Sequence, residues 1–157
     1  MDVAYLSSIQ AKVSFREALA WGTPRTGSIG ISGVAYVPPV PVAETAEASL
    51  AGLMGHGQSA TATALTVFCW VVRSQLFWDG NKRTAMLAAN RILISAGAGI
   101  LLIPDRSMTP FSGILSAFYE SGNSGELERF LYSEAMFGIE PLPPPIAALT
   151  SSQFTRR

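Results

Sequence analysis

Hydrophobic positions recur at helical spacing along most of this chain. Near the start, apolar residues three or four positions apart run from Val3 to Val13, and a glycine and a proline follow at Gly22 and Pro24. This spacing predicts an amphipathic helix over residues 2–21. The same reasoning predicts five further helices, over residues 41–53, 60–76, 81–96, 109–121 and 125–137.

Two segments between the predicted helices have a different pattern. Residues 27–39 carry glycines three positions apart, which disfavour a helix, while residues 34–37 have the composition of a strand. We expect a β-hairpin or an extended flap there. The glycines also loosely match a dinucleotide-binding fingerprint, but prolines follow them instead of a helix, which disfavours that alternative. Residues 99–104 are apolar and end in proline, which predicts a buried extended connection.

The predicted fold is therefore mainly α, with one short β-hairpin. No internal repeat is present, and 157 residues suit one domain, which we place at residues 1–137. The tail over residues 138–157 is rich in proline and is expected to be extended or loose.

Composition narrows the range of partners. Charged residues make up 14% of the chain against about a quarter in ordinary proteins, so we expect extensive burial, and a homo-oligomer would provide some of it. The formal net charge is zero, so the chain lacks the basic field that holds nucleic acid. No apolar run reaches the roughly 18 residues of a membrane span. The N-terminus has no basic region followed by an apolar block, so no secretory signal is expected.

A single cysteine, Cys69, excludes an internal disulfide. It lies in an apolar run and is expected to be a buried, inert thiol. Together with the features above, this predicts a cytoplasmic protein.

The densest group of chemically capable residues is the run 74–85, Ser-Gln-Leu-Phe-Trp-Asp-Gly-Asn-Lys-Arg-Thr-Ala, where a loop leads into a predicted helix. The first N–H groups of a helix lack internal partners and carry partial positive charge, so a helix beginning at Asn81 offers an anion site. Gly80 lets the backbone approach a ligand closely. Arg83 is a forked, permanently charged donor and Lys82 adds a point charge, so the run predicts a phosphate site.

Asp79 stands beside this predicted anion site and would repel phosphate. A Mg²⁺ ion bridging carboxylate and phosphate would reconcile the two charges. The alternative is that Asp-Gly-Asn is an ordinary turn and helix cap followed by two solvated cations. The apolar helices on both sides, with Phe77 and Trp78 between them, favour a site over a surface turn.

These residues resemble the signature of the Fic/Doc (Fido) family, His-x-Phe-x-Asp/Glu-Gly-Asn-Gly/Lys-Arg. The matching residues are Phe77, Asp79, Gly80, Asn81 and Arg83. Lys82 with the following Thr-Ala is similar to the branch that includes the death-on-curing toxins, and the likeness extends from the glycine-rich segment to about residue 137. The resemblance implies a Fic-like helical bundle with a short β-hairpin flap. It also implies transfer of AMP from ATP to a protein hydroxyl or, in the toxin branch, phosphorylation of the target.

The resemblance assigns a role to each matching residue. Asp79 would hold Mg²⁺, and Arg83 would contact a phosphate of ATP. The anion cradle for the phosphates would be formed by Gly80, Asn81 and Lys82. A segment of the target protein would dock by strand addition on flap residues Ile31, Ser32, Gly33 and Val34.

Two departures from the family pattern affect the expected chemistry. Gln75 stands where the family has its general base, a histidine, and an amide cannot accept the proton by ordinary acid–base chemistry. Base catalysis contributes about 10²–10⁴-fold, so ordinary activity should fall steeply. The only histidine, His56, is expected to be a solvated loop residue. Met86 replaces a second arginine found in many relatives, which would weaken the hold on a third phosphate.

Two functions remain open from the sequence. The first is a Fic-like domain that binds ATP and transfers a nucleotidyl or phosphoryl group in an atypical way. The second is an inactive Fic-like module that binds a nucleotide or a partner and serves as a regulator. A chance occurrence of the motif in an unrelated helical protein is the third alternative.

Overall fold

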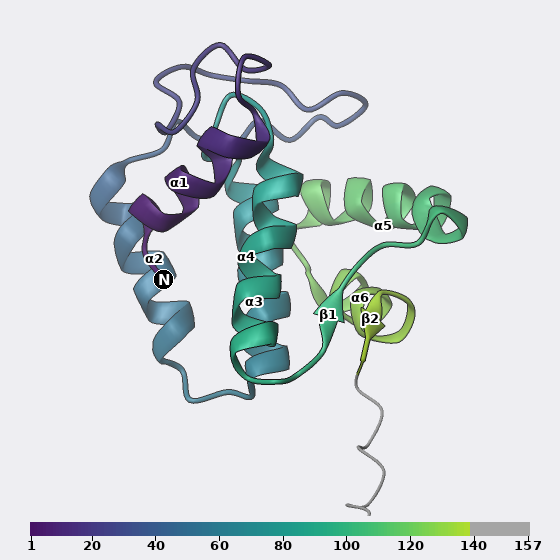
Figure 1. Cartoon of the computed structure of the whole chain (residues 1–157). Helices are drawn as coiled ribbons and strands as arrows, with labels where there is room; N and C mark the ends of the chain where they lie inside the picture. The colour runs from purple at the N-terminus through teal and green to yellow at the C-terminus, as the bar shows by residue number, and fades with distance from the viewer. Residues whose placement is uncertain (139–157) are drawn as a thin grey trace, which may run out of the picture.

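A computed structural model of the chain describes residues 1–138 (Figure 1). The elements in these residues are α1 (Val3–Val13), α2 (Ala43–Gly55), α3 (Ala60–Ser74), α4 (Asn81–Ser95), β1 (Ile100–Leu101), the 3-10 turn η1 (Asp105–Ser107), α5 (Met108–Ser121), α6 (Gly125–Glu134) and β2 (Met136–Phe137). The mainly α prediction is confirmed. The predicted proline-rich tail lies, apart from Gly138, outside the described residues.

The antiparallel helices α3 and α4 form the centre of the molecule. Figure 1 shows α1 and α2 on one side of this pair and α5 and α6 on the other. Most side chains of α3 are buried, and Phe68 and Phe77 are fully enclosed. Burial of apolar surface is the main favourable term in folding, so this pair and the loop that joins it contribute much of the core.

A short loop joins the central helices, and its two ends have left-handed backbone. Ser59 caps the start of α3 by accepting a hydrogen bond from the backbone of Ala62 at 3.2 Å. Gln75, which follows the last residue of α3, has a φ of 46°, and Gly80, which precedes α4, has a φ of 76°. The run 76–80 is thereby placed at one end of the central pair, at the top of Figure 1.

The predicted connection at residues 99–104 is only partly buried. Leu101 is 1% exposed, whereas Leu102 is 55% exposed. Here β1 pairs antiparallel with β2, and the side chain of Asn90 in α4 both donates to and accepts from the backbone of Leu101, at 2.8 and 2.7 Å. Because residues 136–137 pair with β1, α6 ends at Glu134 and not at residue 137 as predicted.

The predicted helix over residues 2–21 is wrong beyond Val13. Residues 14–23 form turns and bends, and apolar Leu19 is 80% exposed, so it covers no core. The cause lies in Gln10, which is fully buried. Its side chain accepts from the backbone of Gly22 and donates to the carbonyl of Asp79 at 3.0 Å, folding the chain back on α1.

The β-hairpin expected over residues 27–39 is also wrong, and the alternative of an extended flap holds. Residues 27–42, which we call the flap, contain no strand and run as a loop across the top of Figure 1. A turn at its tip brings the backbone N–H of Val34 to 3.1 Å from the carbonyl of Ile31, with φ 75° at Gly33. Among the described residues, strand pairing occurs instead between β1 and β2.

No helix in the described part of the chain has both the length and the apolar character that a bilayer crossing requires.

Candidate functional site

A pocket of about 510 Å³ opens at the N-terminal end of α4. Three segments line it: the flap at residues 29–31, the loop and first turn of α4 over residues 75–83, and Tyr119 from α5. The structure therefore brings together the predicted site residues Gln75, Asp79, Gly80, Asn81, Lys82, Arg83 and Ile31. The other flap residues, Ser32 and Val34, line an adjoining groove, and Gly33 forms the tip of the turn.

The loop takes its shape from the side chain of Asn81, which is only 4% exposed. Its Oδ1 accepts from the backbone N–H of Phe77 at 3.0 Å, and its Nδ2 donates to the Phe77 carbonyl at 2.8 Å and to Gln75 Oε1 at 3.1 Å. Both amide protons are thus used inside the loop. Asn81 therefore has its backbone N–H, and not its side-chain amide, to offer to an anion.

The start of α4 has the free donors that an anion requires. The first backbone bond of the helix runs from Thr84 N–H to the Gly80 carbonyl at 2.8 Å. Within residues 1–138, no group accepts a hydrogen bond from the N–H groups of Asn81, Lys82 or Arg83. Such N–H groups point along the helix axis and attract negative charge.

Glycine is the one residue type that fits position 80. Its φ of 76° is strained for other residues, and a Cβ there would lie 2.0 Å from Ser14 Oγ. The backbone of the loop consequently packs directly on the end of α1, which fixes where the first N–H groups of α4 point.

The charges at the pocket mouth already pair with one another. Arg83 Nη1 lies 2.8 Å from Glu17 Oε2, and Nη2 lies 3.3 Å from Asp79 Oδ2. These side chains are about half exposed, and exposed ion pairs contribute little free energy, on the order of 0–1 kcal/mol. A phosphate could therefore displace Glu17 from Arg83 at small cost. Lys82 is exposed beside them.

The pocket has too few metal ligands to hold a metal ion unless a phosphate binds with it. Asp79 is the one carboxylate among the described residues that line this pocket, and residues 1–138 contain no cluster of three metal-ligating side chains. Mg²⁺ commonly binds through one or two carboxylates plus substrate phosphates and water. Asp79 fits that role. It could not hold a metal ion alone, without ligands from a bound phosphate.

Gln75 is a structural member of the loop. Its Nε2 donates to the carbonyl of Val72 at 2.6 Å and to Tyr119 Oη at 3.2 Å, while its Oε1 accepts from Asn81. These contacts stabilise the left-handed backbone at this position, which an L residue adopts at a cost. The side chain links the loop to α5 and offers no titratable group.

Tyr119 is a pocket residue that sequence reasoning missed. It is 4% exposed, and burial raises its pKa to about 12 although the hydrogen bond from Gln75 acts in the opposite direction. The phenol is therefore protonated at neutral pH. Because its oxygen accepts from Gln75, its own O–H remains free to donate to a ligand. In the sequence it is one apolar position of an amphipathic helix, which carries no signal of this role.

Arg25 is a second residue that sequence reasoning missed, and it anchors the base of the flap. It is 1% exposed and, among the described residues, is the only ionised side chain that is buried. Its guanidinium donates to the carbonyls of Gln75, at 2.6 Å, and of Gly27, Pro38 and Pro39. Burial lowers its pKa from the ordinary value. The arginine thereby joins both ends of the flap to the end of α3.

Two further contacts fix the flap over the pocket. Glu120 of α5 accepts a hydrogen bond from the backbone N–H of Ala35. Trp78 packs so closely on Gly27 that a Cβ there would lie 2.8 Å from the indole. The flap therefore rests on the loop through Trp78 and on α5 through Glu120.

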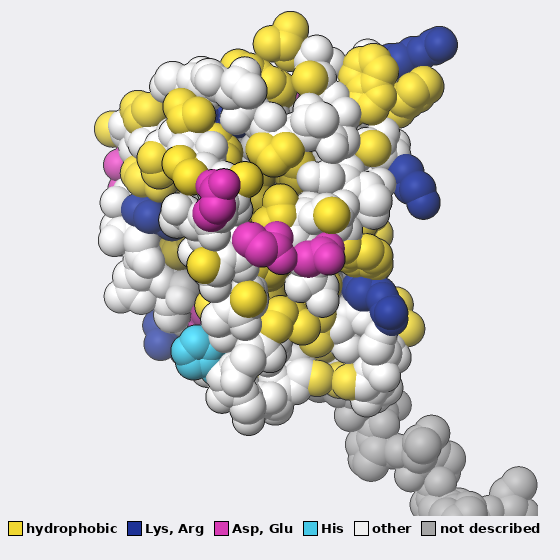
Figure 2. Space-filling view, turned by 90° about the vertical axis from the view of Figure 1, so that its left-hand side faces the viewer, with side chains coloured by type: hydrophobic (Ala, Val, Ile, Leu, Met, Phe, Trp, Pro, Cys, Tyr) yellow, Lys and Arg dark blue, Asp and Glu magenta, His cyan; other side chains and the backbone are white. Residues whose placement is uncertain are grey.

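His56 does not reach this pocket. It is exposed, and it follows α2 at the end of α3 opposite to Gln75. The histidine side chain, cyan in Figure 2, lies low on the face of α1 and α2, whereas the loop lies at the top of Figure 1. Met86 lines the adjoining apolar groove of about 680 Å³, so no second arginine occupies that position.

Comparison with known proteins identifies the fold. No protein-family model and no curated protein matches the chain. Among solved structures, it is similar to BepC, a VirB-translocated Bartonella effector protein from Bartonella tribocorum, crystallised with bound AMPPNP. The match has a TM-score of 0.59 and 20% sequence identity, and covers 83% of this chain and 72% of that chain. The chain thus has a Fic-like helical fold.

Proposed function

We propose that this domain binds a nucleotide, with ATP and Mg²⁺ as the expected pair, in the pocket at the start of α4. The observation that carries the proposal is the set of unpartnered N–H groups of residues 81–83 facing a pocket with two cations. The bound ATP analogue in BepC, whose fold is similar, supports the same ligand class.

Each group has a distinct part in binding. The backbone N–H groups of Asn81 and Lys82 would receive phosphate oxygens, and Gly80 would allow their close approach. Arg83 would exchange Glu17 for a phosphate, a change from one charge partner to another. Asp79 would hold Mg²⁺, which neutralises part of the phosphate charge.

The same geometry favours a binding module over an efficient transferase. A general base must accept a proton at working pH, and Gln75 cannot, while Tyr119 is protonated until far above neutral pH. Gln75 is also occupied by its contacts with Tyr119 and Asn81. We therefore propose that the domain binds its nucleotide without rapid turnover.

Atypical transfer of a nucleotidyl or phosphoryl group to a protein hydroxyl is the second candidate. It is favoured by the flap, because residues 29–31 line the nucleotide pocket and exposed Ser32 and Gly33 follow directly. A target segment docked along residues 31–34 would bring a hydroxyl to the same pocket.

Calorimetry with matched arginine variants tests nucleotide binding. Wild-type protein is titrated with ATP in the presence and absence of Mg²⁺, beside Arg83→Gln and Arg91→Gln. Arg91 lies on the same helix but lines a different pocket. A charge-assisted hydrogen bond is worth about 1.5–3 kcal/mol, so Arg83→Gln should weaken binding by about tenfold or more, with Arg91→Gln unchanged. Equal affinity of all three proteins, or no binding at all, would contradict the proposal.

A labelled-ATP assay separates the two candidates. Gln75→His supplies a base, and Gln75→Ala removes the same side-chain contacts without supplying one. If only the base is missing, transfer by Gln75→His should exceed that by Gln75→Ala by about 10²–10⁴-fold. Transfer by the wild type at a rate equal to Gln75→His would instead favour the atypical enzyme. Absence of transfer in all three would leave the binding module.

A further inference from the structure

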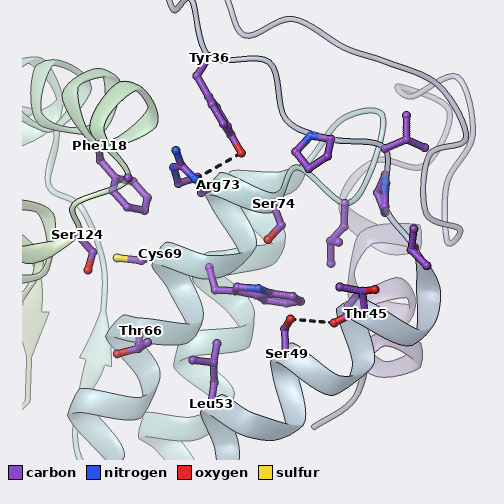
Figure 3. A pocket seen from close by; sticks show the side chains of 18 of the residues that line it. Tyr36, Thr45, Ser49, Leu53, Thr66, Cys69, Arg73, Ser74, Phe118 and Ser124 are labelled. Carbon is purple, nitrogen blue, oxygen red and sulfur yellow. Dashed lines mark hydrogen bonds between the residues drawn. The ribbon is translucent and has the colours of Figure 1, made fainter.

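A second pocket, of about 560 Å³, lies between α3 and α2 and extends to α5 and α6 (Figure 3). It is formed by α2, α3, residues 36–42 of the flap and the junction of α5 with α6. It shares no lining residue with the pocket at the start of α4. Its volume falls in the range of about 300–1,000 Å³ that is usual for small-molecule sites.

The walls of this pocket combine an apolar surface with a few polar groups. Trp70, Leu53 and Phe118 provide flat or bulky apolar contacts. Figure 3 shows hydroxyl groups of α2 on one side, where Ser49 donates to the backbone carbonyl of Thr45 at 2.8 Å. A mostly apolar lining with few polar groups is typical of a site for a small organic molecule.

Arg73 gives the pocket one fixed positive charge. Its guanidinium lies 4.1 Å from the centre of the Tyr36 ring, and its Nη2 donates to the carbonyl of Tyr119 at 3.3 Å. Its Nε is buried and has no hydrogen-bond acceptor within residues 1–138. No carboxylate in that part of the chain forms an ion pair with it. A guanidinium in this condition attracts an anionic group.

Glu128 determines which end of the pocket such an anion would occupy. Its carboxylate lines the pocket and accepts from Ser124 at 3.0 Å. Burial raises the pKa of Cys69, and the negative charge of Glu128 acts in the same direction. In Figure 3, Ser124 and Cys69 lie together, apart from the stacked Tyr36 and Arg73. An anionic ligand group would be repelled from the Cys69 end and attracted to the Arg73 end.

We propose that this pocket is a second ligand site, for a small molecule with a flat apolar body and one carboxylate or sulfonate group. The anionic group binds Arg73, and the apolar body lies against Trp70. This proposal does not rest on the nucleotide binding proposed above, because the two pockets have no lining residue in common.

Two related probes test the proposal. Anilinonaphthalene sulfonate has the proposed chemistry, and phenylnaphthylamine is the same molecule without the anionic group. The chain has three tryptophans, and Trp70 lines this pocket whereas Trp78 lines the nucleotide pocket. In a heteronuclear NMR titration of the wild type, the sulfonate should shift the indole N–H signal of Trp70, assigned with Trp70→Phe, and leave that of Trp78 in place. A shift of Trp78 alone, or of neither, would overturn the proposal.

Arginine variants test the anion contact. Arg73→Gln should lower affinity for the sulfonate by about tenfold or more, with affinity for phenylnaphthylamine unchanged within about twofold. Arg83→Gln is the matched control, since Arg83 lines the neighbouring pockets, and it should leave sulfonate binding unchanged. Equal loss of both probes in Arg73→Gln, or unchanged sulfonate affinity in the folded variant, would contradict the role of Arg73. Circular dichroism establishes whether the Arg73→Gln variant is folded. The NMR titration of the wild type shows where the sulfonate binds, whether or not that variant folds.

Discussion

The loop over residues 75–80 and the flap over residues 27–42 border the same pocket but are stabilised in different ways. The loop is shaped largely by local contacts, chiefly those of Asn81 with Phe77 and Gln75. The flap contains no strand, and its position depends on side chains from outside it, above all Arg25. The backbone that is proposed to bind an anion is therefore held by residues next to it in the chain, whereas the flap is held by residues of other segments.

Helix α5 contributes to both regions through two consecutive residues. Tyr119 contacts Gln75 of the loop, and Glu120 accepts from Ala35 of the flap. The loop thus receives a buried support from α5, whereas the flap receives an exposed one. Three substitutions and one change of pH should distinguish the contacts that hold the loop from those that hold the flap. They follow in decreasing order of expected effect on stability.

Arg25→Met should have the largest effect on stability. It removes one buried and three partly buried hydrogen bonds to carbonyl oxygens of the flap and of Gln75, and each buried group left unpaired costs about 1–3 kcal/mol. Allowing for relaxation, we expect a loss of about 3–4 kcal/mol in the free energy of unfolding, measured in urea. Exposed Arg129→Met is the control and should change it by less than about 0.5 kcal/mol. A loss below about 1 kcal/mol for Arg25→Met would show that the flap has other anchors of equal strength.

Alkaline pH should weaken the buried support of the loop. The pKa of Tyr119 is raised from 10.0 to about 12, so its contribution to stability is fully present below pH 10 and is lost as pH rises to about 12. The expected loss is about 2–3 kcal/mol. Measured in urea at a series of pH values, the wild type should lose this free energy relative to Tyr119→Phe. A constant difference between the two proteins across this interval would refute the assignment.

Asn81→Ala should cost about 2 kcal/mol in the free energy of unfolding and should also abolish ATP binding. Asn90→Ala is a matched control. The side chain of Asn90 likewise makes two hydrogen bonds to the backbone of a single residue, Leu101, but away from the pocket. We expect a similar loss of stability there with ATP affinity unchanged, by calorimetry. If the two variants bind ATP equally, the loop does not depend on Asn81 for its function.

Glu120→Gln should have the smallest effect. Its contact with Ala35 is exposed, so the free energy of unfolding should change by less than about 0.5 kcal/mol. Amide hydrogen exchange at Ala35 should nevertheless become about two- to fivefold faster, because the neutral amide oxygen of glutamine accepts the Ala35 N–H less strongly than the charged carboxylate does. Glu126→Gln on α6 is the exposed control and should leave exchange at Ala35 unchanged. If Glu120→Gln also leaves it unchanged, Glu120 does not support the flap.

The comparison also explains what could be predicted from the sequence. The helices α2 to α6 follow from apolar periodicity, and the pocket at the start of α4 is lined by residues adjacent in the chain, Asp79 to Arg83, which the sequence already singled out. The end of α1 could not be predicted, because it depends on Gln10 reaching Asp79 across the fold. The flap and the roles of Arg25 and Tyr119 depend equally on contacts between residues far apart in the sequence.

The burial of Cys69 has a practical consequence. It is the sole cysteine of the chain and is 3% exposed, and burial raises the pKa of its thiol to about 12, so it is unreactive in neutral buffer. A new thiol introduced by Ser32→Cys at the tip of the flap would then be the single target for a maleimide dye. Fluorescence could then report whether that tip moves when ATP is added, without first removing a native residue.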